Sequence, residues 1–402
     1  MTRLRVAVVA GETSGDQLGA ALIAALAATV PDLEVRGVCG PLMRAAGCVP
    51  LAEAHELAVM GLIEPLAHLP RLWRLRRRLR REFMAWRPDV FIGIDAPGFN
   101  LGLAAQLHEA GLKTVQYVSP QVWAWREHRV RHIAAACDLV LCLLPFEPAF
   151  YAEHAVRALF VGHPLADQIP LDLDRSAARQ SLGIALDATV VALLPGSRAG
   201  EVARLGRDFY AASMRLAIGG ADATGVAIEF IAPMASPPLR VVFERAGAPS
   251  GVTSGVAHAA LALRLLDGQA RLALQAADVA LVASGTASLE ALLCQCPMVV
   301  AYRLSALTAW LLRRLRLVKL PYFSLPNLLA GEALVPEFFQ QAVTGPALAQ
   351  AVKTMLDNRA RCAALQSRFR LIHASLRRGG AALAAAAVLE LVAAGPVDAG
   401  RR

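Results

Sequence analysis

The sequence predicts an α/β protein made of two doubly wound, Rossmann-like domains that face a cleft. Three observations lead to this prediction. The chain has 402 residues, which is more than one hydrophobic core usually serves. Short apolar runs alternate with longer helical patterns, as in parallel sheets with crossover helices. A polar, proline-containing stretch, Pro164–Arg179, separates two such series.

The first domain is expected to span residues 1–165 and to begin with the apolar run Val6–Ala10. This run is shorter than the roughly 7–15 apolar residues of a secretory signal peptide, so it is expected to be a buried strand. Turn-forming residues such as Gly40-Pro41 follow most of the later runs. The remaining strands are expected at Val35–Cys39, Val90–Ile94, Thr114–Val118, Leu139–Leu143 and Leu159–Val161.

The second domain is expected to span residues 166–375. Its strands are expected at Val190–Leu194, Ile228–Ala232, Val279–Val282 and Met298–Ala301. Residues 376–402 are expected to form a helix and tail that either return to the first domain or exchange with a partner chain, which leaves a homodimer open. In doubly wound sheets ligands bind beyond the carboxyl ends of the strands, so the motifs at these ends are the candidate sites.

The formal net charge of +9 is concentrated in two segments. Arg71–Arg87 contains eight arginines and one glutamate, and Arg303–Lys319 contains five basic residues and no acidic one, whereas the rest of the chain is slightly acidic. A charge this local favours contact with a membrane surface or an anionic ligand over general nucleic-acid binding. Apolar residues make up 56% of the chain and charged residues 18%, which excludes a disordered protein.

The cysteine pattern and the hydropathy indicate a cytoplasmic protein. The seven cysteines form no CxxC pair and are expected to be free thiols in a reducing compartment. No uncharged apolar run reaches the length of a membrane span. No HExxH, paired-cysteine or DxD arrangement suggests a metal site, so none is expected.

The first basic segment is expected to form an amphipathic helix that begins near Pro70. Its core-facing stripe includes Leu75, Leu79 and Phe83. A second edge mixes apolar and basic residues, which is typical of a helix on an anionic membrane surface. The expected membrane-facing residues are Leu69, Trp73, Arg76, Arg77 and Arg80. The alternative is an arginine-rich face exposed to water, arising only from codon bias.

Two turns of the second domain are candidates for phosphate binding. Ser197 and Arg198 follow a strand and Gly196, and an arginine fork matches phosphate oxygens. Ser284, Gly285 and Thr286 open a helix whose free N–H groups favour an anion, and Glu290 is placed to accept from sugar hydroxyls. The alternatives are turns without a ligand and a solvated helix glutamate. Neither turn is a P-loop, and Gly11–Asp16 is not a dinucleotide fingerprint, which disfavours kinases and dehydrogenases.

Three turns of the first domain are candidates for binding a second substrate. Asp95 stands at the end of an apolar strand, where partial burial raises the proton affinity of a general base; the alternative is a helix cap. The small residues of Gly11–Asp16 leave room for a substrate, or form a plain turn. Trp123 bounds a sugar or acyl pocket, or belongs to the core. The expected acceptor-binding residues are Ser14, Gly15, Asp16, Asn100 and Trp123.

In their order along the chain, these motifs resemble those of the bacterial lipid-A-disaccharide synthase family, which has the GT-B glycosyltransferase fold. The motifs that carry the resemblance are Ala10–Asp16, Met60-Gly61, Asp95-Ala96-Pro97, Tyr117–Trp125, Phe146-Glu147, Leu194–Arg198, Ser284–Glu290 and Ser324–Leu329. The chain departs from the family pattern at Gly98, where a second acid is usual, and at Gln121, where a serine is usual.

The resemblance implies an inverting, metal-independent transfer of 2,3-diacylglucosamine from UDP to 2,3-diacylglucosamine 1-phosphate, with no cofactor, at the inner face of the cytoplasmic membrane. It implies that Asp95 is the catalytic base and that Arg198, Asn327 and the Ser284–Glu290 turn bind the nucleotide sugar. Other classes stay open: a different UDP-N-acetylglucosamine-dependent transferase or epimerase, a membrane-surface scaffold, and, least favoured, a nucleic-acid binder.

Overall fold

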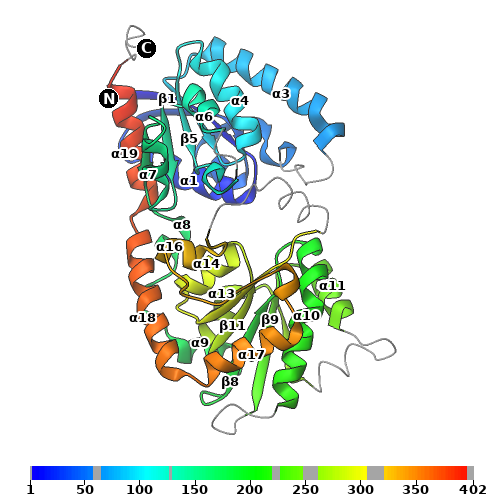
Figure 1. The fold of residues 1–402 in the computed structure, drawn as a ribbon. Coiled ribbons are helices and arrows are strands. Elements are labelled where there is room, and N and C mark those ends of the chain that lie inside the picture. Colours follow the sequence, from blue (N-terminus) through cyan, green and yellow to red (C-terminus); the bar gives the residue numbers. More distant parts are fainter. Residues whose placement is uncertain are drawn as a thin grey trace. The chain divides into compact units, whose positions relative to one another are not determined.

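The computed structural model describes residues 2–57, 65–125, 129–219, 227–247, 261–305 and 321–395. The Met60-Gly61 motif and residues 306–319 of the second basic segment lie outside these ranges. The chain divides into two compact units, one formed by residues 1–167 and 376–402 and the other by residues 168–375. Each unit is built on its own parallel sheet (Figure 1).

In the described part of the first unit, seven parallel strands form one sheet in the order β3-β2-β1-β4-β5-β6-β7. The strands are β1 (Arg3–Ala10), β2 (Asp32–Cys39), β3 (Cys48–Glu53), β4 (Val90–Ile94), β5 (Lys113–Tyr117), β6 (Leu139–Cys142) and β7 (Ala158–Phe160). The helices are α1 (Thr13–Ala27), α2 (Pro41–Ala45), α3 (Pro65–Trp86), α4 (Pro97–His108), α5 (Val122–Trp125), α6 (Val130–Ala136), α7 (Glu147–Ala152), α8 (Pro164–Gln168) and α19 (Gly380–Ala393), with a 3-10 turn at Ala54–Glu56.

Alternating residues of the buried strands supply a core on each face of this sheet, as the period of two predicts. On β1, Val6 and Val8 join the core beneath α1, whereas Ala7 and Val9 join the core beneath α3 and α4. The helix α19 completes the first of these cores through residues such as Val388, and it packs against α1. The last helix therefore belongs to the first unit.

In the described part of the second unit, six parallel strands form a sheet in the order β10-β9-β8-β11-β12-β13. The strands are β8 (Thr189–Leu194), β9 (Ile228–Met234), β10 (Leu263–Asp267), β11 (Val279–Ala283), β12 (Met298–Tyr302) and β13 (Glu337–Phe339). The helices are α9 (Arg175–Leu182), α10 (Ala199–Ile218), α11 (Pro237–Gly247), α13 (Ala270–Ala276), α14 (Thr286–Leu293), α16 (Leu325–Ala330), α17 (Gly345–Leu356) and α18 (Arg359–Leu376), with a 3-10 turn at Gln340–Ala342.

The expected apolar runs all lie on strands, with ends shifted by a few residues. Of the strands in the described ranges, three were missed, β3, β10 and β13, and each lies at an edge of its sheet. These edge strands need no continuous apolar run because many of their side chains are exposed or half-buried, whereas the central strands β4, β8 and β11 are buried throughout. Pro50 in β3 and Arg264 in β10 interrupt the apolar pattern that reveals the central strands. Among the described residues, no helix combines the length and the apolar character that crossing a membrane needs.

Candidate functional site

The strand order reverses once in each sheet, between β1 and β4 in the first and between β8 and β11 in the second. At such a point the two neighbouring chains leave the sheet in opposite directions, which opens a crevice at the carboxyl ends of the strands. Four predicted turns follow these four strands: Gly11–Asp16, Asp95–Asn100, Leu194–Arg198 and Ser284–Glu290. The structure therefore brings two predicted turns of each unit together at the switch point of its sheet.

The backbone of the turn after β4 is strained at two successive residues. Asp95 and Ala96 both have positive φ, 52° and 40°, although neither is glycine. Such conformations cost about 1–3 kcal/mol each and persist where the surroundings impose them. The Asp95 N–H donates to the carbonyl of Tyr117 at 2.9 Å. The side chain is half-buried, and burial raises the pKa of the Asp95 carboxyl, against the opposing effect of the Ala96 N–H. This suits a general base.

Asn100, expected on the acceptor side, is fully buried beneath this turn. Its amide nitrogen donates to the carbonyl of Asp95 at 2.8 Å and to the carbonyls of Val9 and Ile94 at 3.3 Å each. These contacts differ from the expected contact with an acceptor, because the amide nitrogen bonds to the backbone of the turn. Gln116, which the sequence reasoning missed, donates to the same Asp95 carbonyl at 3.1 Å. The only feature of the sequence that pointed to Gln116 is that it is a polar residue within the apolar run of β5.

Of the three residues after β1 that were expected to bind the acceptor, one is exposed and two are buried. Ser14 is exposed, whereas Gly15 is packed under the strands and Asp16 is 3% exposed. The Asp16 carboxylate accepts three backbone hydrogen bonds, from Gly40 at 2.9 Å, Leu42 at 2.9 Å and Met43 at 3.0 Å. Asp16 therefore caps α2 instead of facing the acceptor as expected. Of the three expected residues, Ser14 has a side chain open to a ligand; Glu12 and Thr13 of the same turn are exposed as well.

Trp123 belongs to a polar cluster at the carboxyl ends of β5 and β6. Its indole nitrogen donates to Glu147 Oε1 at 3.1 Å, and its ring meets Phe146 edge-to-face with centroids 4.9 Å apart. Glu147 is 3% exposed, and its other oxygen accepts from the Leu144 N–H at 3.0 Å. Burial raises the pKa of Glu147 to about 7, against the opposing hydrogen bonds to its carboxylate. Glu147 was missed as a site residue, although the Phe146-Glu147 motif after β6 marked it.

In the second unit, two turns that contain glycine follow the neighbouring strands β8 and β11. They place the N-termini of α10 and α14 at the carboxyl ends of these strands. Gly196 has φ 134°, and a Cβ there would lie 2.6 Å from the Cβ of Glu201, so only glycine fits. Ser197 N–H donates to Glu201 Oε2 at 3.1 Å, and Arg198 stands at the N-cap of α10. The Arg198 side chain is 80% exposed and lies 3.4 Å from Glu201 Oε1. An arginine held this loosely is available to an anion.

The second glycine turn precedes α14. Gly285 has φ 142° at the N-cap, and Thr286 is the first helical residue. The Ser288 hydroxyl donates to the Gly285 carbonyl at 2.7 Å, which fixes the turn. Ser284 donates from its hydroxyl to the Phe323 carbonyl at 3.2 Å. Because β8 and β11 are paired, the N-termini of α10 and α14 lie at the same edge of the sheet. Two adjacent helix N-termini favour two adjacent negative charges.

The last two predicted residues of this unit have protein partners. Glu290 forms an ion pair with Arg271 at 3.4 Å and keeps 21% of its side chain exposed. Asn327 is 1% exposed; it exchanges hydrogen bonds with the backbone of Val335 and donates to Glu337 Oε1 at 2.9 Å. Glu337 also accepts from the backbone and the hydroxyl of Ser324. Asn327 thus supports the turn at Ser324, which differs from the expected direct contact with the nucleotide sugar.

The predicted amphipathic helix is α3. Leu75, Leu79 and Phe83 are buried in the core as expected. Trp73 is 60% exposed, and the guanidinium carbon of Arg77 lies 5.6 Å from the centre of its ring. Arg80 is exposed. The side chain of Leu69 lies outside the described side chains.

Arg76 differs from the expectation that it faces outward. Its guanidinium lies 5.0 Å from the centre of the Phe99 ring and donates to the carbonyl of Gly98 at 3.1 Å. Gly102 of α4 makes the room, because a Cβ there would come within 2.7 Å of the guanidinium. In the second basic segment, Arg303 is likewise held by the protein: it donates to the Arg204 carbonyl at 3.0 Å.

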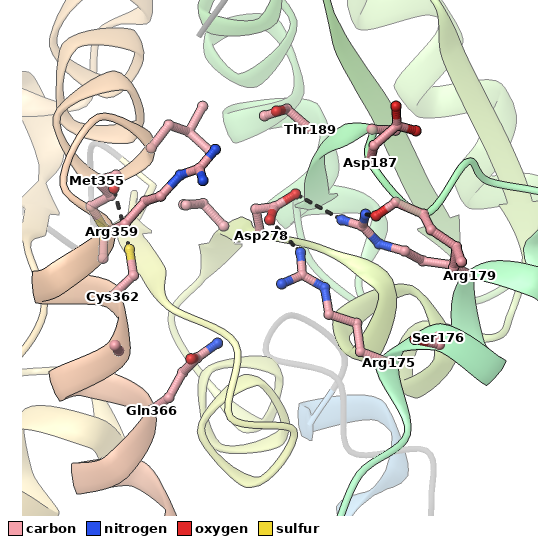
Figure 2. Close-up of a pocket in the computed structure, with 15 residues that line it drawn as sticks. Arg175, Ser176, Arg179, Asp187, Thr189, Asp278, Met355, Arg359, Cys362 and Gln366 are labelled. Atoms are coloured by element: carbon pink, nitrogen blue, oxygen red, sulfur yellow. Dashed lines mark hydrogen bonds and ion pairs between the residues drawn. The ribbon is translucent and has the colours of Figure 1, made fainter. Parts of the chain in front are cut away.

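A cavity of about 520 Å³ lies at the opposite, amino ends of β8 and β11. Figure 2 shows Asp278 between Arg175 and Arg179, with ion pairs to both. Arg179 is 4% exposed, and its Nε donates to the Ala276 carbonyl at 3.0 Å. None of the predicted site residues lines this cavity, so we assign its charged cluster to the stability of the second unit. Within the described ranges, no group of three or more His, Cys, Asp or Glu side chains is arranged to hold a metal.

Comparison with known proteins adds a family and a fold. The family model for lipid-A-disaccharide synthetase matches residues 6–391. A lipid-A-disaccharide synthase from Pseudomonas paraeruginosa is 52% identical over 390 residues, which cover 97% of this chain and 98% of the relative. The calicheamicin glycosyltransferase CalG4 aligns with a TM-score of 0.58 at 15% identity, covering 98% of this chain and 99% of that one.

A UDP-GlcNAc 2-epimerase from Neisseria meningitidis, solved with UDP-GlcNAc bound, also aligns with a TM-score of 0.58, at 12% identity, covering 98% of this chain and 100% of that one. These structural likenesses, together with the two parallel sheets, confirm the predicted α/β fold of the GT-B class.

Proposed function

The chain belongs to the lipid-A-disaccharide synthase family, a family of glycosyltransferases, and from this premise we propose its substrates and its mechanism. The donor is UDP-2,3-diacylglucosamine and the acceptor is 2,3-diacylglucosamine 1-phosphate. The products are the β-1,6-linked disaccharide 1-phosphate and UDP. One observation carries the assignment of the sites: the catalytic candidate of the first unit and the phosphate-binding turns of the second each stand at the switch point of a parallel sheet.

Asp95 is the general base of this proposal. Its carboxylate takes the proton of the acceptor 6-hydroxyl as that oxygen attacks the anomeric carbon of the donor, and the bond from this carbon to UDP breaks with inversion. The partial burial of Asp95 supports this role, because it raises the pKa of the carboxyl and so strengthens the base. At Gly98, where the family usually has a second acid, this chain has no carboxylate, which leaves Asp95 as the acid of the turn.

The leaving UDP carries negative charge that the second unit is placed to stabilise. The 80%-exposed Arg198 and the N–H groups that open α14 at Gly285 and Thr286 supply donors without rearrangement of the fold. Ser197 and Ser284 line the two turns, and Glu290 accepts from sugar hydroxyls at its exposed side. With these donors in place, we propose that the reaction needs neither a metal nor a cofactor.

The enzyme works at the inner face of the cytoplasmic membrane in this proposal, because both sugars carry acyl chains. The exposed Trp73 with Arg77 and Arg80 on α3 supports contact with an anionic lipid surface. These residues recur at spacings of four and three, which places them on one side of the helix. Each basic residue near such a surface contributes about 1 kcal/mol to binding.

Product formation tests the proposal. Purified protein is incubated with labelled acylated UDP-glucosamine and acylated glucosamine 1-phosphate, and the products are separated by chromatography. A disaccharide that forms only when both acylated substrates are present is the expected result.

The second candidate, a transferase or epimerase acting on UDP-N-acetylglucosamine, shares the GT-B fold. Turnover of the non-acylated donor with no disaccharide product would favour that candidate and exclude the first. If the protein bound liposomes but converted neither donor, it would act as a scaffold.

A further inference from the structure

Two buried amide side chains lie directly beneath the Asp95 turn. Asn100 is 0% exposed and Gln116 is 1% exposed. We propose that Gln116, together with Asn100, is a positioning residue that fixes the direction in which the Asp95 carboxylate points. This inference rests on the proposed function, in which Asp95 is the base, and it adds residues that act on the reaction without touching substrate.

The geometry of the hydrogen bonds supports this role. The Asp95 carbonyl accepts from both amides, at 2.8 Å from Asn100 and 3.1 Å from Gln116, which fixes the peptide plane after Asp95. The Asp95 N–H donates to the Tyr117 carbonyl at 2.9 Å, which fixes the peptide plane before it. With both flanking planes fixed, the direction of the Cα–Cβ bond of Asp95 is fixed as well.

The two amides also join the ends of three strands. Asn100 donates to the last carbonyl of β4, Ile94, and to Val9 near the end of β1, both at 3.3 Å. Gln116 on β5 donates to the Val118 carbonyl at 3.3 Å. Val118 has a φ of 75°, so this network holds left-handed backbone at two strand ends. The network therefore stabilises conformations that the chain would otherwise avoid.

The amide pair is costly to bury, which argues against a purely structural role. Neither Asn100 Oδ1 nor Gln116 Oε1 has a hydrogen-bond donor among the described residues. A buried polar atom without a partner costs about 1–3 kcal/mol. Gly93 makes room for both, because a Cβ there would lie 2.8 Å from the Asn100 Cβ and 3.1 Å from Gln116 Oε1. Apolar side chains would fill this space at lower cost but would donate nothing to the Asp95 carbonyl.

The test replaces the donor while keeping the shape. Gln116→Met keeps an unbranched side chain of the same length and removes the amide. We expect kcat for disaccharide formation to fall by about tenfold or more, since small misplacements of a catalytic group cost up to about a hundredfold, while KM for the UDP-sugar stays within about twofold.

Thr114→Val is the matched control. Thr114 is also fully buried, lies two residues earlier on the same strand and face, and donates to the Ala136 carbonyl at 2.8 Å, at the other end of β5. This variant should lose stability without losing kcat. Equal kcat in Gln116→Met and Thr114→Val would overturn the positioning role.

Two further variants keep the outcomes distinct. If Gln116→Met does not fold, Asn100→Leu removes the other donor and carries the same expectation. Asp95→Asn separates this inference from the proposed function. Normal turnover in Asp95→Asn refutes Asp95 as the base and the positioning role with it. An inactive Asp95→Asn beside a fully active Gln116→Met refutes the positioning role alone.

Discussion

The indole nitrogen of Trp123 donates a hydrogen bond to the carboxylate of Glu147, with 3.1 Å between Nε1 and Oε1. The glutamate is 3% exposed, and the backbone N–H of Leu144 binds its other oxygen. The tryptophan expected to border the acceptor site is thus oriented by a carboxyl group buried beside it. Burial raises the pKa of this carboxyl from 4.5 to about 7, which makes the cluster sensitive to pH in the neutral range.

Glu147→Gln tests the cost of this buried charge. In the unfolded chain the carboxyl ionises near its usual pKa, so the native state holds more protons between about pH 4.5 and 7. Native stability therefore falls as pH rises through this window and stays lower above it, by up to about 3 kcal/mol. Glu147→Gln has no carboxyl at this position, so its stability lacks this fall with pH. Its unfolding free energy relative to that of the wild type should therefore increase between pH 5 and 8, as measured by urea denaturation. Glu153→Gln, an exposed position after the same helix, is the control. Parallel pH curves for wild type and Glu147→Gln would contradict the expectation.

Asp95→Asn should lower kcat by at least about a hundredfold, because it removes the proton acceptor but keeps the shape of the side chain. Binding of the UDP-sugar should persist, since the donors for UDP lie in the other unit. Steady-state kinetics and titration with UDP measure the two effects. Asp89→Asn is the control, because this exposed carboxylate stands at the amino end of the same strand and bonds to the Arg5 N–H at 2.7 Å. Near-normal kcat in Asp95→Asn would remove Asp95 from the mechanism.

The pH dependence of kcat provides a separate check on Asp95. Burial raises the pKa of this carboxyl above its usual 3.8, so the base is lost by protonation at a higher pH than an exposed aspartate would require. As pH falls, kcat should therefore decline with a midpoint above 3.8, and rates measured between pH 4 and 8 locate it. A midpoint at or below 3.8 would show that the group is not desolvated in the working enzyme.

Arg198→Gln should weaken UDP binding by at least about tenfold, because a hydrogen bond to a charged group contributes about 1.5–3 kcal/mol. The side chain is 80% exposed and its pair with Glu201 is long at 3.4 Å, so the fold should tolerate the change. Isothermal titration with UDP measures the loss. Arg207→Gln removes the same charge from an exposed position further along α10 and should leave the affinity unchanged. If both variants lost the same UDP affinity, the loss would reflect the net charge of the protein and not a direct contact between Arg198 and UDP.

The sequence predicted the switch-point turns because their signals are local: an apolar run, then glycine, proline or a carboxylate. The buried strands β1, β4, β8 and β11 each end in such a run. The directions of individual side chains, by contrast, depend on contacts with residues distant in the sequence. Asp16 faces α2 because the N–H groups of Gly40, Leu42 and Met43 need an acceptor. That requirement is visible only once both segments are folded.

The positions of the Asn100 and Arg76 side chains, which the sequence did not predict, share one physical cause. Helical periodicity predicts the angle at which a side chain leaves the helix axis. It does not predict which residue of a neighbouring element the side chain contacts. Asn100 lies under the ends of β1 and β4, whose carbonyls accept from it. Arg76 finds the ring of Phe99 and the space above Gly102 on the adjacent helix α4. Each side chain is therefore held by a partner distant in sequence.

Membrane binding can be tested on one helix by comparing two of its faces. Trp73, Arg77 and Arg80 share one side of α3, so Arg77→Gln/Arg80→Gln should weaken binding to liposomes rich in anionic lipid by about 2 kcal/mol, or about thirtyfold. UDP affinity should not change. The control Arg74→Gln/Arg78→Gln removes the same charge elsewhere on the helix; there Arg78 pairs with Glu82 at 3.3 Å. If both pairs weaken binding equally in a sedimentation assay, the contact is diffuse and the proposed face is wrong.

Asp278→Ala should destabilise the second unit through the cluster in Figure 2. The side chain of Arg179 is 5% exposed and pairs with Asp278 at 2.9 Å, and the same carboxylate oxygen accepts from the Val190 N–H at 2.8 Å. Removing one partner of a buried pair leaves a charge without compensation, which costs about 3–5 kcal/mol. Because Asp278 is partly exposed, the lower end of this range is expected, measured by urea denaturation. Asp172→Ala breaks the pair with Arg370 at a position 89% exposed and should cost less than about 1 kcal/mol. A loss at Asp278 no larger than at Asp172 would mean that water compensates Arg179, and the cluster would then contribute little to holding α9 against β11.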